Sequence, residues 1–187
     1  MSNHDYEFEK DYWGNCANTF DEDQKHFVYA KFMEIPQTHY SFDVKGKRIL
    51  DIGGGPSSML LKCKNLKEGK VCDPIKYPHW TKLRYAEHKI GVKVQRGEDV
   101  NEEGWDEVWI YNCLQHVDSV ERIINNAKRA APVLRIFEWI DIPAHEGHPV
   151  ELTKELLDGI ICLPGSGTVT LRESGCYGTA YYGVFRQ

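Results

Sequence analysis

The chain has 187 residues, of which 41% are hydrophobic and 27% charged, and its formal net charge is −5. This composition is typical of a globular protein with one full core, and no apolar run approaches the roughly 20 residues that a membrane span needs. The first nine residues are polar and acidic, so we expect no signal peptide there.

Six cysteines are scattered along the chain without a close pair, at positions 16, 63, 72, 113, 162 and 176. Such spacing is typical of reduced thiols in small core or surface positions rather than of a disulfide framework. We therefore expect a cytoplasmic protein.

The N-terminal segment is predicted to be an arm followed by one helix. Residues 19–22 have the pattern of a capping box, which predicts a helix over residues 20–35 that Pro36 ends. Residues 37–46 form a polar connection. We expect residues 1–45 to act as a lid or to cover a sheet face, and residues 46–187 to form the main domain.

After residue 46, predicted strands and helices alternate. The predicted strands are 48–53, 70–73, 92–94, 107–112, 133–140, 168–172 and 179–185. The predicted helices are 56–64, 77–89, one that opens at 118–121 and includes Ala127, and 149–157. Alternation of this kind indicates a mostly parallel sheet with helices on its faces, that is, a doubly wound α/β fold of three layers. The last two strands are joined through residues 174–176 and predict an antiparallel C-terminal hairpin.

One crossover is too short for a helix. Residues 97–106 are few and acidic, so one face of the sheet lacks a helix at that point. We expect the helix over residues 20–35 to help to cover this gap.

Residues 48–58 combine a buried strand, an acid, three glycines and small residues that start a helix. Glycines allow a backbone to approach a ligand closely, and a helix N-terminus offers free N–H groups. Asp73 ends the next strand, 20 residues after Gly53, where a carboxylate accepts hydrogen bonds from a ribose. A dinucleotide-binding fingerprint that starts at Gly53 needs glycines at positions 53, 55 and 58, but position 58 is serine. The glycines therefore argue against a nicotinamide dinucleotide as the ligand.

Four motifs, in order, resemble those of class I S-adenosylmethionine-dependent methyltransferases with a Rossmann-like fold. They are residues 50–55 (Leu-Asp-Ile-Gly-Gly-Gly), 71–74 (Val-Cys-Asp-Pro), 97–99 (Gly-Glu-Asp) and 111–117 (Tyr-Asn-Cys-Leu-Gln-His-Val). The resemblance covers residues 46–187 and implies a seven-stranded sheet, the cofactor S-adenosyl-L-methionine and methyl transfer. Many members of the family have a glycine near position 57, where this chain has Pro-Ser-Ser over 56–58.

The resemblance also implies roles for particular residues. The backbone of the glycine turn (Gly53, Gly54 and Gly55) lies along the amino-acid part of the cofactor. Asp51 orders that turn or reaches the methionine ammonium group through water, and a hydroxyl at Ser57 donates to the carboxylate. Asp73 binds the ribose. Asp99, or Glu98 as the nearer alternative, reaches the adenine, and Asn112 offers its carbonyl to the ammonium group.

Substrate-side residues are suggested by their place in the predicted fold. His116, just beyond the fourth strand, is the candidate general base for a hydroxyl acceptor. The loop after the fifth strand offers Trp139, Asp141, His145 and His148 for acceptor recognition, and its spacing matches no standard zinc motif, so we expect no metal. Tyr12 and Trp13 are candidates for a lid over the cofactor.

Three functions remain open from the sequence. The leading prediction is a methyltransferase for a small-molecule or modest polar acceptor. The first alternative is an RNA or nucleotide methyltransferase, because residues 62–96 hold ten Lys/Arg and three acids, a local net charge of +7. The second is a cofactor-binding subunit without activity of its own. The sequence does not indicate an oligomeric state.

Overall fold

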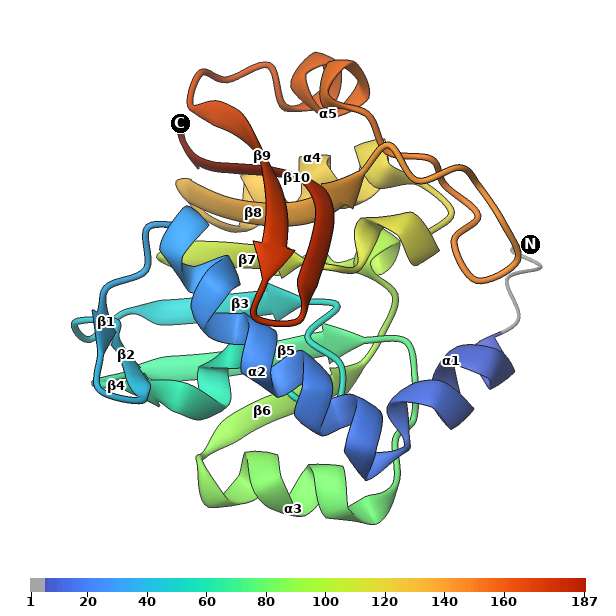
Figure 1. Cartoon of the computed structure of the whole chain (residues 1–187). Coiled ribbons are helices and arrows are strands. Elements are labelled where there is room, and N and C mark those ends of the chain that lie inside the picture. Colours follow the sequence, from blue (N-terminus) through green and yellow to red (C-terminus); the bar gives the residue numbers. More distant parts are fainter. Residues whose placement is uncertain (1–5) are drawn as a thin grey trace.

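Seven strands form one mixed sheet in the computed structural model, which describes residues 6–187 (Figure 1). Their order across the sheet is β6-β5-β3-β7-β8-β10-β9. Their bounds are β3 Arg48–Ile52, β5 Glu68–Asp73, β6 Ile90–Val94, β7 Glu107–Tyr111, β8 Val133–Ile140, β9 Ser166–Glu173 and β10 Cys176–Arg186. Neighbouring strands from β6 to β8 are parallel, whereas β10 runs antiparallel to both β8 and β9. The predicted mostly parallel sheet with its antiparallel hairpin is thus confirmed.

Helices cover both faces of this sheet and give the three predicted layers. They are α1 Tyr6–Trp13, α2 Cys16–Phe32, α3 His79–Glu87, α4 Val120–Ala130 and α5 Lys154–Ile161. One core contains α4 and α5, with residues such as Ile124 and Leu157 against Ile110 of β7. The other core contains α2 and α3, and in it Tyr29 stacks on Phe137 at a ring distance of 4.4 Å.

The predicted start of the first long helix is wrong by about one turn. The helix α2 begins at Cys16 because the side chain of Asn15 accepts a hydrogen bond from the N–H of Ala17 and caps it. Thr19, the predicted cap, lies inside the helix, where its hydroxyl donates to the carbonyls of Trp13 and Asn15.

The predicted helix over residues 56–64 does not form. The chain instead makes a short 3-10 helix, η1 (Met59–Lys62), and a short strand, β4 (Cys63–Lys64). Two backbone N–H groups here donate to tyrosine hydroxyls from distant elements. The N–H of Ser58 donates to Tyr85, and the N–H of Met59 donates to Tyr111. A segment of nine residues gains little from helix formation alone, so these tertiary hydrogen bonds decide its conformation.

The helix α2 covers the opposite face from the one predicted. The crossover over 97–106 holds only a 3-10 turn, η2 (Gly97–Asp99), as expected, but its buried Val100 and Trp105 belong to the core of α4 and α5. The core on the other face contains Tyr29 and Met33 of α2 together with Met59. This helix therefore covers the face on which residues 56–64 fail to form a helix.

Two further segments differ from the prediction. The last helix begins after Thr153, whose side chain caps it, so Pro149 lies in the loop before it and not in its first turn. The polar connection over 37–46 contains two short strands, β1 (Gln37–Thr38) and β2 (Ser41–Asp43), and β2 pairs with β4. Within residues 6–187 no helix has both the length and the apolar character needed to cross a bilayer.

Candidate functional site

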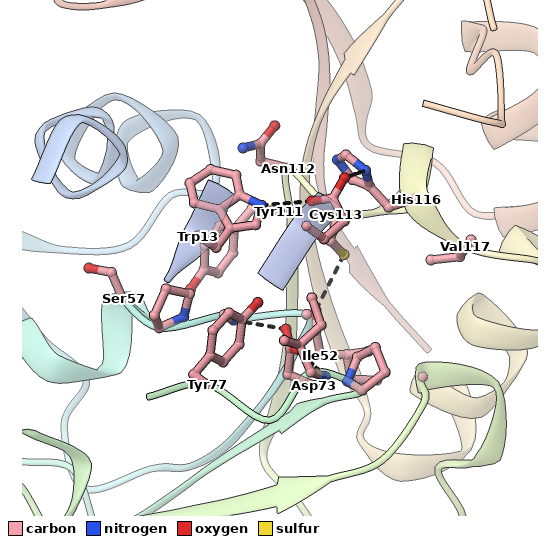
Figure 2. A pocket seen from close by; sticks show the side chains of 18 of the residues that line it. Trp13, Ile52, Ser57, Asp73, Tyr77, Tyr111, Asn112, Cys113, His116 and Val117 are labelled. Carbon is pink, nitrogen blue, oxygen red and sulfur yellow. Dashed lines mark hydrogen bonds and ion pairs between the residues drawn. The ribbon is translucent and has the colours of Figure 1, made fainter. Parts of the chain in front are cut away.

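A cavity of about 820 Å³, counting its open mouth, lies at the carboxyl ends of β3, β5 and β7. The strand order reverses between β3 and β7, so the crevice where ligands bind in open α/β sheets falls here. Figure 2 shows Asp73 and Tyr77 in the lower part of this cavity and Trp13, Asn112 and His116 in its upper part. All four sequence motifs contribute residues to its walls, together with the N-terminal helices.

The glycine turn after β3 has the backbone conformation that its sequence predicts. Gly53 and Gly55 have φ values of +82° and +59°, in the region that residues with a Cβ disfavour. A Cβ on Gly53 would lie 2.6 Å from the side chain of Cys113, and one on Gly54 would meet the carboxylate of Asp51 at 2.4 Å. Gly55 is different, because its missing Cβ would meet only the Tyr77 hydroxyl, at 3.7 Å. Backbone at Gly55 is therefore open to a ligand in the cavity.

Asp51 lies beneath this turn and not in the cavity wall. Its fully buried carboxylate accepts hydrogen bonds from the hydroxyls of Ser58 and Tyr111. Burial raises the pKa of Asp51 to about 7, although these two hydrogen bonds act to lower it. Ser57, by contrast, lines the cavity, and its hydroxyl donates to Asp23 of α2 at 3.0 Å.

Asp73 lines the cavity at the end of β5. One carboxylate oxygen accepts the N–H of Gly55 at 3.1 Å, and the other accepts that of Ile75 at 2.9 Å. Burial raises its pKa to about 6, while these backbone hydrogen bonds and one from Tyr77 lower it. An ionised carboxylate has about four acceptor positions, so Asp73 can also accept from ligand hydroxyls. Tyr77 was not predicted, and its place after the acidic motif is the signal that could have found it.

The acidic turn after β6 presents Glu98, not Asp99, to the cavity. Glu98 is buried and accepts hydrogen bonds from the backbone N–H groups of Asp118 and Ser119, before α4. The side chain of Asp99 is 55% exposed, pairs with Arg122 and lines a shallow depression outside the cavity. Of the two predicted alternatives, only Glu98 is thus in contact with the first cavity.

The end of β7 turns sharply into the cavity. Asn112 has a φ of +49°, a conformation that asparagine tolerates better than most residues. The turn is held by Glu138 of β8, whose buried carboxylate accepts the N–H groups of Cys113 and Leu114. Burial raises the pKa of Glu138 to about 7, and the two backbone hydrogen bonds act in the opposite sense.

The N-terminal helices supply two buried acids to the site, Glu9 and Glu22, and neither was predicted. Glu22 of α2 accepts a hydrogen bond from the Asn112 amide at 2.9 Å and pairs with Lys25. Glu9 of α1 accepts one from the indole N–H of Trp13, also at 2.9 Å. The spacing of four residues between Glu9 and Trp13 on one helix was the available signal. Trp13 itself lines the cavity.

His116 lies where the first cavity meets a second one. Its Nδ1 is 3.0 Å from a carboxylate oxygen of Glu9, and its ring is 4.6 Å from that of His148. Burial lowers the pKa of His116, but the hydrogen bond and charge of Glu9 outweigh this effect, so the pKa lies above its usual value. Figure 2 shows the imidazole at the rim of the cavity, near Cys113.

The second cavity has about 1200 Å³ of space including its mouth and shares Glu9, Trp13, Asn112 and His116 with the first. Three of the predicted acceptor residues line it, namely Trp139, His145 and His148, and so does Tyr12. Burial and the charge of His116 lower the pKa of His148 to about 4, which keeps this ring neutral at pH 7. Asp141 is exposed and lies outside this wall.

The basic stretch over 62–96 is partly neutralised. Lys62 pairs with Asp23, Lys70 and Lys93 pair with Glu102, and Arg96 pairs with Asp118. Among residues 6–187 no group of three or more His, Cys, Asp or Glu side chains has the arrangement of a metal site. All six cysteines are free.

Comparison with known proteins identifies the fold. The chain is similar to N-methyltransferase NodS from Bradyrhizobium japonicum in complex with S-adenosyl-L-homocysteine, with a TM-score of 0.70, 15% identity and 98% of each chain covered. It is also similar to a SAM-dependent methyltransferase from Aquifex aeolicus (TM-score 0.60, 18% identity, 95% of this chain and 97% of that one). A third similar structure is the mitomycin 7-O-methyltransferase MmcR (0.58, 16%, 91% and 54%). No family model matches the sequence, and a search of curated proteins gives no match. The predicted class I methyltransferase fold is thereby confirmed.

Proposed function

We propose that this protein is an S-adenosylmethionine-dependent methyltransferase that acts on a small polar acceptor. The observation that carries the proposal is the pair of adjoining cavities, one walled by the four motifs and the other by aromatic and histidine side chains. A methyl donor and a methyl acceptor must be bound next to each other, because the transfer is an in-line displacement between two bound molecules. Adjoining cavities meet this requirement.

The residues of the first cavity fit the proposed cofactor. Gly55 leaves its backbone open to a ligand because nothing closer than 3.7 Å occupies the space where a Cβ would lie. Asp73 keeps an acceptor position for a ribose hydroxyl, and Glu98 lines the same cavity. Asn112 lines the same cavity as the glycine turn and is our candidate for binding the methionine end.

The bound cofactor would supply a methyl group activated by the positive charge of its sulfonium sulfur. The chain's own residues then have to align the acceptor, exclude water and handle a proton. Trp13 and Glu9 of α1 lie over the junction of the two cavities, which favours exclusion of water. His116, at the same junction, is within reach of both cavities and can take a proton from a hydroxyl acceptor.

The second cavity fits a small, partly aromatic acceptor better than a polymer. Its walls include the rings of Trp13, Trp139 and His148, which favour planar or apolar groups with a polar end. The similar structures include both an N- and an O-methyltransferase, so this fold accommodates either acceptor atom. Acidic side chains pair with Lys62, Lys70, Lys93 and Arg96 of the basic stretch, which weakens the RNA alternative in part, and salt-sensitive RNA binding would support it.

Calorimetry tests the cofactor. We expect S-adenosylmethionine and S-adenosylhomocysteine to bind and NAD not to bind. Binding of NAD alone would contradict the proposal. A screen of amines, phenols, thiols and short RNAs, read by formation of S-adenosylhomocysteine, tests the activity. Tight cofactor binding without turnover on any acceptor would favour the non-catalytic alternative.

A further inference from the structure

Glu9 lines both cavities, and none of the four sequence motifs accounts for an acid at this position. Its side chain comes from α1, outside the motif-bearing part of the chain, and it is only 5% exposed. One carboxylate oxygen accepts the indole N–H of Trp13 at 2.9 Å, and the other lies 3.0 Å from Nδ1 of His116. A buried carboxylate is costly unless it is paired, so both contacts hold Glu9 in place.

His116 has a defined set of charged and polar neighbours. Glu9 faces it from α1, Glu138 lies beneath it on β8, and His148 packs edge-on against it from the loop after β8. The backbone of Gly147 also raises the pKa of this ring, more weakly than Glu9 does. Glu138 is already engaged with the N–H groups of Cys113 and Leu114. Glu9 is therefore the carboxylate that lies in direct contact with the imidazole, 3.0 Å from Nδ1.

We infer that Glu9 is the positioning residue for His116 in methyl transfer to a hydroxyl acceptor, delivered to the site by α1. The inference rests on the proposed function. The Glu9 carboxylate, 3.0 Å from Nδ1, favours a proton on that nitrogen and leaves Nε2 as the basic nitrogen. The negative charge also stabilises the imidazolium that forms when the base accepts a proton.

The proton balance of the step is simple. Nε2 of His116 takes the proton of the acceptor hydroxyl as that oxygen gains the methyl group, whose bonding electrons stay with the sulfur. The imidazolium then returns the proton to solvent. Because Glu9 belongs to α1, the base is complete only when this helix is packed over the junction.

The test is an NMR titration of the histidine side chains in the whole protein, with and without S-adenosylhomocysteine. The spectrum holds eight histidines, and a His116→Asn variant assigns the signal of interest. In Glu9→Gln the titration midpoint of His116 should fall, because the amide retains a hydrogen bond but not the charge. Glu9→Asp should restore part of the midpoint shift.

Glu22→Gln is the matched control. Glu22 is a second buried acid in the same cavity wall, but its partners are Asn112 and Lys25, so the midpoint of His116 should stay unchanged. An unchanged midpoint in Glu9→Gln, or an equal shift in both variants, would overturn the inference.

Turnover separates this inference from the proposed function. With the hydroxyl acceptor that the screen identifies, kcat of Glu9→Gln should fall about 10- to 100-fold, because the negative charge that stabilises the imidazolium is lost. Its pH profile should shift toward acid in parallel with the NMR midpoint. A midpoint shift with full kcat would refute the role in the reaction. A midpoint shift in a protein that binds no S-adenosylmethionine would refute the proposed function and leave the pairing intact.

Discussion

The hydroxyl of Tyr111, the last residue of β7, donates a hydrogen bond to the carboxylate of Asp51 in the neighbouring strand β3. The same hydroxyl accepts the backbone N–H of Met59 at 2.9 Å. One side chain thus joins the fourth motif to the acid of the first motif and to the segment that follows the glycine turn. Asp51 is thus held by Ser58 and Tyr111 and does not line the cavity.

Replacing Tyr111 with phenylalanine tests this connection. The change leaves the buried N–H of Met59 without its partner and removes one of the two hydrogen bonds to the same Asp51 oxygen, which Ser58 still donates to; such a loss costs about 1–3 kcal/mol. We expect the free energy of unfolding to fall by this amount in urea denaturation, and the affinity for S-adenosylmethionine to fall with it. A variant as stable as the wild type would show that the hydroxyl is dispensable.

Asp73 and Asp99 form a matched pair for cofactor binding. Asp73→Asn should weaken S-adenosylmethionine binding about 10- to 100-fold in calorimetry, because charged acceptors of ribose hydroxyls are lost. Asp99→Asn should leave affinity unchanged, since this residue lies outside the cavity. Equal losses in the two variants would contradict the assignment of the ribose position.

The stability of the protein should depend on pH through Asp51. Its pKa rises on folding from the ordinary 3.8 to about 7, so its contribution is fully present below about pH 4 and is lost as the pH rises through about 7. We expect the free energy of unfolding of the wild type to decline over this pH range. In Asp51→Asn the decline should be smaller by on the order of a few kcal/mol. Parallel wild-type and variant profiles from chemical denaturation would contradict the raised pKa.

Two glycines of the turn should respond differently to alanine. Gly53→Ala places a Cβ 2.6 Å from Cys113, so we expect mainly a loss of stability, of about 1–3 kcal/mol. Gly55→Ala meets no such contact, and its methyl group would occupy ligand space. Here the strain of the left-handed backbone costs about 1 kcal/mol, while cofactor affinity should fall more than stability does. Thermal unfolding and calorimetry on both variants separate the two effects.

Much of the cofactor side could be predicted because its signals are local. A strand followed by an acid and three glycines specifies a turn with positive φ, as Gly53 and Gly55 show. An acid at the end of the next strand then reaches the same edge, because parallel strands bring their carboxyl ends together. The lack of an α-helix at residues 56–64 was not predictable in this way, because the hydroxyls of Tyr85 and Tyr111 accept hydrogen bonds from the backbone N–H groups there.

By itself, the sequence determined the alternation of strands and helices, the closing hairpin and the motifs that meet at one edge of the sheet. Only the tertiary structure decided which acid of the pair Glu98 and Asp99 faces the cavity, and that Glu9 reaches His116. The physical reason is that periodicity and turn propensities act over a few residues, whereas side-chain direction and the contacts of α1 depend on how distant elements pack. Local sequence motifs therefore specify the cavity proposed for the cofactor. The cavity proposed for the acceptor depends on how distant elements pack.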